Sequence, residues 1–119
     1  MNIFTDWVNS AKHALRGVYV LLSKERNAQI HLLMAVITIA FGSYLSISSF
    51  EWSLITLCIS LVIALEAINT AIERLVDLVS PNWHSLAKDA KDIAAAGVLI
   101  ASIGTAIVGA LIFFPKLFL

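Results

Sequence analysis

The sequence predicts an all-α membrane protein in which one amphipathic surface helix precedes three transmembrane helices. Of its 119 residues, 60% are hydrophobic and 13% are charged, and the mean hydropathy is +0.90. A soluble domain of this size needs far more polar surface to cover its core. The length accommodates a single membrane domain over residues 1–119, with about three spans of about 20 residues. The formal net charge is zero, so charge gives no reason to expect a nucleic-acid partner.

Residues 3–23 are expected to form the surface helix. Apolar side chains such as Trp7 recur at helical spacing among charged ones such as Asp6 and Lys12. Such a helix suits either the headgroup layer of a membrane or a surface of other protein, and both interpretations place it at the membrane surface. The first strongly apolar stretch begins only near Leu32, so we expect retained membrane anchors rather than a cleaved secretory signal.

Three apolar segments are expected to span the membrane. Residues 28–47 carry no formal charge, and residues 52–79 continue a helical pattern up to a Ser-Pro-Asn break. Pro81 ends the second span because proline disfavours helix in the residue before it. The third span covers residues 86–114, with Pro115 as its expected end. Its glycines are expected to allow close helix packing: Gly97, Gly104 and Gly109.

The loop charges predict the orientation of the spans. Lysine and arginine precede the first span and flank the second connection, whereas the first turn has none. The positive-inside rule then places the N-terminus and the second connection in the cytoplasm. Lys116, at the other end of the third span, opposes this assignment.

A polar stripe interrupts the second span. Its members fall at helical offsets 0, 3, 7 and 11: Glu66, Asn69, Glu73 and Asp77. At about 100° per residue they share a stripe roughly 80° wide. An acidic residue inside a span costs about 2.5–3.5 kcal/mol on insertion scales, so it usually faces the bundle interior and is functional. The alternative is an interhelical hydrogen-bond network, but this number of polar groups on one stripe favours a functional site.

Two other polar clusters are predicted at the same membrane depth. Glu25 and Asn27 precede the first span, and a charged segment, Lys88 to Asp92, begins the third helix. Clustered carboxylates suit Mg²⁺, and magnesium beside cationic side chains suits nucleotide phosphates. A carboxylate at the edge of the lipid could accept the proton of an alcohol that attacks a γ-phosphate. The five glycines are scattered, so no glycine-rich phosphate loop is present.

The run Glu66-Ala-Ile-Asn69-Thr-Ala-Ile-Glu73-Arg-Leu-Val-Asp77 resembles the signature of the prokaryotic diacylglycerol kinase and undecaprenol kinase family. Trp83-His84 and Ala90-Lys91-Asp92-Ile-Ala-Ala-Ala-Gly-Val-Leu resemble the segment that follows it in the family. Glu25-Arg26-Asn27 and Ile30-His31-Leu32 resemble the beginning of the family's first span, and look more like the undecaprenol kinase branch. The similarity extends over nearly the whole chain.

This resemblance implies ATP-dependent phosphorylation of a membrane lipid alcohol, either undecaprenol or diacylglycerol, with Mg²⁺ as cofactor. It also implies a homotrimer with composite active sites between subunits. The protein would lie in the bacterial cytoplasmic (inner) membrane, with its active site on the cytoplasmic side.

The resemblance also implies roles for individual residues. Glu66 would be the general base, Asn69 would orient the catalytic groups, and Glu66 and Ala95 would contact the lipid. Glu25 and Glu73 would hold magnesium with the ATP phosphates. The remaining nucleotide-binding residues would be Asp77, His84, Lys91 and Asp92, with His13 and Arg16 from the surface helix. Two departures affect nucleotide and lipid contacts: His13 stands where the family often has tyrosine, and Gln29 where it often has arginine.

Two other functions are consistent with an intramembrane glutamate. An ion-coupled carrier needs polar groups through both halves of the bilayer, but the segment from Leu54 to Leu65 offers only Thr56, Cys58 and Ser60. A non-catalytic membrane subunit would use its carboxylates to fix helix pairing. In that case Glu66→Gln would damage assembly as much as any activity, whereas a kinase would assemble normally and lose turnover.

Overall fold

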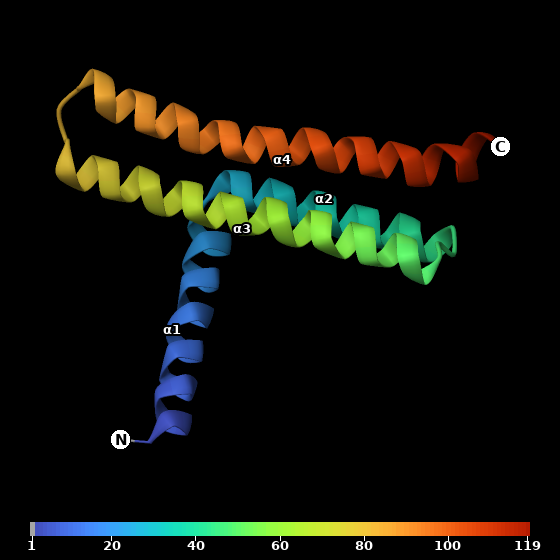
Figure 1. The fold of residues 1–119 in the computed structure, drawn as a ribbon, viewed down its shortest axis with the longest axis horizontal. Coiled ribbons are helices and arrows are strands. Elements are labelled where there is room, and N and C mark those ends of the chain that lie inside the picture. The colour runs from blue at the N-terminus through green and yellow to red at the C-terminus, as the bar shows by residue number, and fades with distance from the viewer. Residues whose placement is uncertain (1) are drawn as a thin grey trace.

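The computed structural model describes residues 2–119, which form four α-helices and no strand (Figure 1). The helices are α1 (Ile3–Lys24), α2 (Arg26–Tyr44), α3 (Ser49–Val79) and α4 (Ser85–Phe118). Figure 1 shows α2, α3 and α4 running side by side, whereas α1 projects away from them. The last three helices are long and apolar enough to cross a membrane. The predicted all-α fold with three membrane-spanning helices is therefore confirmed.

Helix α3 starts earlier than hydropathy indicated, because its first turn is capped. The Ser48 hydroxyl accepts a hydrogen bond from the backbone N–H of Glu51 at 3.1 Å, and the Glu51 carboxylate accepts one from the N–H of Ser48 at 2.9 Å. This reciprocal capping box satisfies two backbone donors at the start of a helix. It places the start of α3 at Ser49, three residues before the apolar run.

The expectation that Pro115 ends the last helix is wrong, because α4 continues to Phe118. Proline lacks the backbone N–H and so removes one helical hydrogen bond, but its fixed φ is compatible with a helix. The last turn still closes, since the N–H of Leu119 donates to the carbonyl of Pro115 at 3.0 Å.

The turn between α2 and α3 is packed by apolar side chains. Ile47, Ile55 and Ile112 form a buried cluster there, with Trp52 packed against it. Gly42 makes this packing possible, because a Cβ at that position would lie 2.8 Å from Cη2 of Trp52. The expected close packing at the glycines of α4 is not made within residues 2–119, since a Cβ there would meet no atom within 4 Å: Gly97, Gly104 and Gly109.

Candidate active site

Glu66 and Asn69 are buried on the inner face of α3, with only 3% and 5% of their surfaces exposed. A buried carboxylate in an apolar span requires polar partners. His31 on α2 supplies one, since its Nε2 lies 3.8 Å from Oε2 of Glu66. That separation is too long for a direct hydrogen bond. The two helices therefore bring an imidazole and a carboxylate together within the bundle.

A break between α1 and α2 carries Glu25 to the same part of the bundle. The backbone of Glu25 is extended, with φ −102° and ψ 115°, and forms the cap of both helices. The side-chain amide of Gln29 donates to the carbonyl of Leu22 at 3.0 Å and so satisfies the end of α1. We call this break, residues 24–26 with the Gln29 hydrogen bond, the elbow. It fixes the point from which the Glu25 side chain extends.

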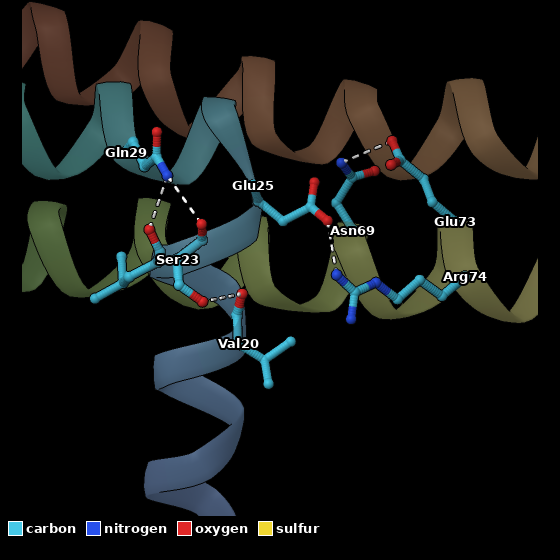
Figure 2. A network of polar contacts seen from close by, with 8 residues as sticks. Val20, Ser23, Glu25, Gln29, Asn69, Glu73 and Arg74 are labelled. Carbon is cyan, nitrogen blue, oxygen red and sulfur yellow. Dashed lines mark hydrogen bonds and ion pairs between the residues drawn. The ribbon is translucent and has the colours of Figure 1, made fainter.

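One polar contact joins the elbow to α3, and a second lies within α3 beside it. Arg74 Nη2 donates to Glu25 Oε1 at 2.9 Å, and Asn69 Nδ2 donates to Glu73 Oε1 at 3.3 Å. Figure 2 shows Glu25, Asn69, Glu73 and Arg74 gathered where the elbow meets α3. The structure thus assembles the two carboxylates expected to hold metal beside the expected catalytic amide.

The donor chemistry of this group fits magnesium. Mg²⁺ takes oxygen ligands and usually keeps several waters or substrate phosphates, so few protein ligands suffice. Glu25 and Glu73 offer carboxylate oxygens, and Oδ1 of Asn69 is buried without a hydrogen-bond partner. Among residues 2–119, however, no group of three or more histidine, cysteine, aspartate or glutamate side chains is positioned to hold a metal.

A second polar cluster lies at the connection between α3 and α4. It surrounds a cavity of about 210 Å³ whose wall includes four of the expected nucleotide-binding residues: Asp77, His84, Lys91 and Asp92. Asp77 pairs with Lys91, and Lys88 pairs with Asp92 at 2.8 Å. His84 also caps α4, because its Nδ1 accepts the backbone N–H of Leu86 at 3.1 Å.

Three expected residues lie outside these clusters. His13 is exposed halfway along α1, and Ala95 is exposed on α4. Arg16 lines a separate cavity of about 420 Å³ between α1 and α3, together with Thr70 and Arg74. A single chain therefore does not bring all the expected residues to one place.

An apolar cavity of about 380 Å³ lies between the three membrane-spanning helices. His31 lines it from α2, Cys58 from α3, and Ser102 and Phe113 from α4. Because His31 also approaches Glu66, the cavity begins next to the buried carboxylate.

No role follows from the sequence for His31 or Arg74, although both contact expected catalytic or metal-binding groups. Their contacts join residues 35 and 49 positions apart in the chain, respectively. Local periodicity places residues on a helix face but does not rotate one helix relative to another. His31 does belong to the Ile-His-Leu segment that resembles the family. That segment was the sequence feature from which a role for His31 could have been inferred.

Comparisons with known proteins identify the family of this chain. The family model for prokaryotic diacylglycerol kinase matches residues 12–113. An undecaprenol kinase of Bacillus subtilis (strain 168) is 40% identical over 116 residues, which cover 98% of this chain and 94% of that protein. A diacylglycerol kinase of Synechocystis is 39% identical over 109 residues, which cover 91% of this chain and 62% of the relative.

A third relative is less similar in sequence but matches along most of its length. A diacylglycerol kinase of Haemophilus influenzae is 33% identical over 111 residues, covering 92% of this chain and 94% of that protein. The family match covers most of the chain and includes every expected site residue. The chain therefore belongs to the prokaryotic diacylglycerol kinase family and is a lipid kinase.

Proposed function

We propose that this lipid kinase transfers the γ-phosphate of ATP to undecaprenol at the cytoplasmic face of a bacterial inner membrane. The similarity to an undecaprenol kinase along almost the full length of both chains supports this substrate. The Glu-Arg-Asn and Ile-His-Leu segments at the start of α2 support it as well. Diacylglycerol is the competing substrate, because relatives named for it also match.

The observation that carries the proposal is the buried Glu66 beside an apolar cavity. A lipid alcohol can reach Glu66 from within the membrane while its chain stays in apolar surroundings. Glu66 would accept the proton of the hydroxyl as that oxygen attacks the γ-phosphate. Asn69, one turn along α3, would orient the reacting groups. Ala95 on α4 would contact the lipid at the surface of the bundle.

The cavity between the helices supports a substrate with a single long apolar chain. Its wall is mostly aliphatic, and it lies within the membrane-spanning parts of α2, α3 and α4. Pockets of this size hold molecules that are largely apolar, with a few polar groups to fix their orientation. The first part of a polyprenyl chain would fill it, and the rest would extend into the bilayer.

Glu25, Glu73 and Oδ1 of Asn69 would hold Mg²⁺ together with the ATP phosphates. When bound, magnesium supplies positive charge that stabilises the phosphates of the reacting nucleotide. The buried, unpartnered oxygen of Asn69 supports this assignment, because such an oxygen is costly unless a ligand satisfies it.

The polar cavity at the α3–α4 connection would bind the nucleotide. Lys91 would contact phosphate oxygens, while Asp77, His84 and Asp92 would shape the site around them. His13 and Arg16 on α1 would approach the base and ribose. The cationic and carboxylate groups that line the cavity support this function, since such groups recur at nucleotide-phosphate sites.

The active form would be a homotrimer whose sites are completed between subunits. Large apolar side chains remain exposed along the chain, such as Leu57, Ile100 and Leu111. Lipid or a second subunit would cover them. In a single chain, His13 and Ala95 lie apart from Glu66 and Glu73. In the trimer, each would instead reach the active site of a neighbouring subunit.

The carrier and non-catalytic interpretations receive no support from the family match, because the matched family and the relatives are named as kinases. The proposed orientation, with the elbow and the α3–α4 connection in the cytoplasm, gives the site access to ATP. It rests on the lysine and arginine residues before α2 and around the connection.

The test is phosphate transfer from radiolabelled ATP by purified protein in mixed micelles. Undecaprenol and diacylglycerol would be offered separately and in competition, each at the same mole fraction. We expect transfer to both lipids to be detectable and kcat/KM to be higher for undecaprenol. Preferential transfer to diacylglycerol would reject the proposed substrate, and transfer to neither lipid by folded protein would reject the assignment.

A further inference from the structure

Arg74 has a position that the proposed chemistry does not explain. It lies on α3 directly after Glu73, yet its guanidinium turns to the elbow and donates to Oε1 of Glu25 at 2.9 Å. Figure 2 shows this contact beside the hydrogen bond between Asn69 and Glu73. Within the described part of the chain, no other ion pair joins α3 to the elbow.

The two carboxylates proposed to hold magnesium come from different elements. Glu73 is fixed on α3 and is held by Asn69 at 3.3 Å. Glu25 instead extends from the elbow, where the backbone leaves helical geometry between α1 and α2. Its distance from Glu73 therefore depends on how the elbow sits against α3. Arg74 is the side chain that makes that connection.

The ion pair leaves part of Glu25 available. Arg74 binds Oε1, so Oε2 of the same carboxylate can take a second partner. A ligand held on its outer side by a hydrogen bond has fewer orientations to lose when it binds a metal ion. Such outer partners typically matter for metal affinity even though they never touch the metal.

We infer that Arg74 is a positioning residue for magnesium: it holds the Glu25 carboxylate against α3, so that Glu25 and Glu73 present oxygens to the same ion. The inference rests on the proposed function, in which these two carboxylates hold Mg²⁺ with the ATP phosphates. The effect is attributed to the hydrogen bond from Arg74 to Glu25 and not to the positive charge near the site.

Two effects of Arg74 oppose each other. A guanidinium near the site repels a metal cation, whereas its hydrogen bond orders a ligand of that cation. The Arg74 side chain is 50% exposed, so water and salt screen its long-range repulsion. The hydrogen bond acts directly on the ligand, and its geometry does not depend on that screening. The ordering effect therefore dominates.

The test compares Arg74→Ala with Arg26→Ala. Arg26 is the residue after Glu25, and within the described residues it makes no ion pair, so its removal takes the same charge from the elbow without breaking the contact. The probe is Mn²⁺ in place of Mg²⁺, with a non-hydrolysable ATP analogue, and free Mn²⁺ is followed by electron paramagnetic resonance. We expect Arg74→Ala to weaken Mn²⁺ binding about tenfold and Arg26→Ala to leave it unchanged.

Kinetics provide an independent readout. In Arg74→Ala the Mg²⁺ concentration for half-maximal rate should rise by a similar factor, and saturating Mg²⁺ should restore kcat. A general structural defect would not be rescued by metal. If Arg74→Ala does not fold, Arg74→Met removes the hydrogen-bond donors while keeping most of the side-chain length, and the same results are expected.

Unchanged Mn²⁺ binding in Arg74→Ala would overturn the inference. So would equal weakening in Arg26→Ala, because the effect would then not depend on the contact between Arg74 and Glu25, or a rate that saturating Mg²⁺ fails to restore. These outcomes are separate from the fate of the proposed function. If the wild-type protein phosphorylates neither lipid, that function fails, whereas the Mn²⁺ titration still reports on the connection between Arg74 and Glu25.

Discussion

The two ends of the α3–α4 pair are built from different interactions. At the turn end, near the α2–α3 turn, a buried isoleucine cluster and the close approach of Gly42 to Trp52 hold the helices together. At the connection end, near the α3–α4 connection, charged contacts predominate: Glu25 with Arg74, Asp77 with Lys91, and Lys88 with Asp92. One end is organised by apolar packing and the other by polar groups.

This difference indicates that the turn end contributes mainly to stability and the connection end mainly to activity. Half-exposed ion pairs contribute little to folding, typically about 0–1 kcal/mol each, so stability alone does not account for their concentration at the connection end. Apolar packing at the turn end contributes far more per residue. Substitutions at the connection end should therefore change activity more than stability, and substitutions at the turn end should do the reverse.

Apart from the general base Glu66, the largest effect on activity is expected from Glu73→Gln. It removes a proposed magnesium ligand, and losses of charge stabilisation in such sites reduce kcat on the order of 10²–10³-fold. The amide oxygen of glutamine can still accept the hydrogen bond from Asn69, so the melting temperature in detergent should change little. Phosphate transfer and thermal unfolding would be measured on the same preparation.

The matched control is Glu51→Gln, at the other end of the same helix. Glu51 caps α3 and pairs with Lys116 at 3.3 Å, but it lies at the turn end. Its variant should keep full activity per folded molecule. Equal loss of activity in both variants would remove the distinction between the two ends.

The largest effect on stability is expected from Gly42→Ala. The added Cβ would lie 2.8 Å from Cη2 of Trp52 and 3.1 Å from Cδ1 of Ile47, so a rigid indole and a buried side chain must shift. Overpacking of this kind destabilises proteins by about 1–3 kcal/mol. Thermal unfolding in detergent should show a lower melting temperature, with normal phosphate transfer at low temperature.

Gly104→Ala provides the comparison for Gly42→Ala. Within residues 2–119 its Cβ would meet no atom within 4 Å, and alanine favours helix over glycine by about 1 kcal/mol. Its melting temperature should therefore stay the same or rise. If the melting temperature of Gly104→Ala falls as far as that of Gly42→Ala, the contact with Trp52 does not explain the loss of stability in Gly42→Ala.

The smallest effect is expected from Lys88→Ala. Both side chains of the Lys88–Asp92 pair are more than half exposed, and the residues lie one helical turn apart. Exposed pairs of this kind contribute little to stability because solvent screens them, so the melting temperature should barely change. Lys91 lies three residues further along the same helix, and Lys91→Ala should instead raise the KM for ATP. If Lys88→Ala raises that KM by more, the roles of the two lysines are reversed.

Hydropathy and length were enough to predict the fold class, because a span of the bilayer requires about 20 apolar residues and leaves few alternatives. The polar stripe of α3 was visible for a similar reason: helical periodicity fixes which residues of one helix share a face. Glu66 and Asn69, the two buried polar members, could therefore be singled out before their surroundings were known.

Contacts between helices could not be predicted in the same way. The pairing of Arg74 with Glu25 depends on the rotation of α3 and on the bend of the elbow, and neither is encoded in local spacing. The cap formed by Ser48 and Glu51 was present as a Ser-x-x-Glu pattern, but apolar content alone placed the helix start later. At Pro115 the sequence signal was instead overestimated. A proline close to the end of a helix removes too few hydrogen bonds to stop the helix there.

The polar stripe of α3 is expected to perform chemistry and not merely to hold helices together. Glu66→Gln tests it most directly, because the side chain keeps its size and loses its charge and basicity. Turnover and thermal stability would be measured on the same purified protein. We expect turnover to fall on the order of 10²–10⁴-fold while the melting temperature and assembly are retained. Full turnover, or a loss of turnover that only follows a loss of assembly, would contradict it.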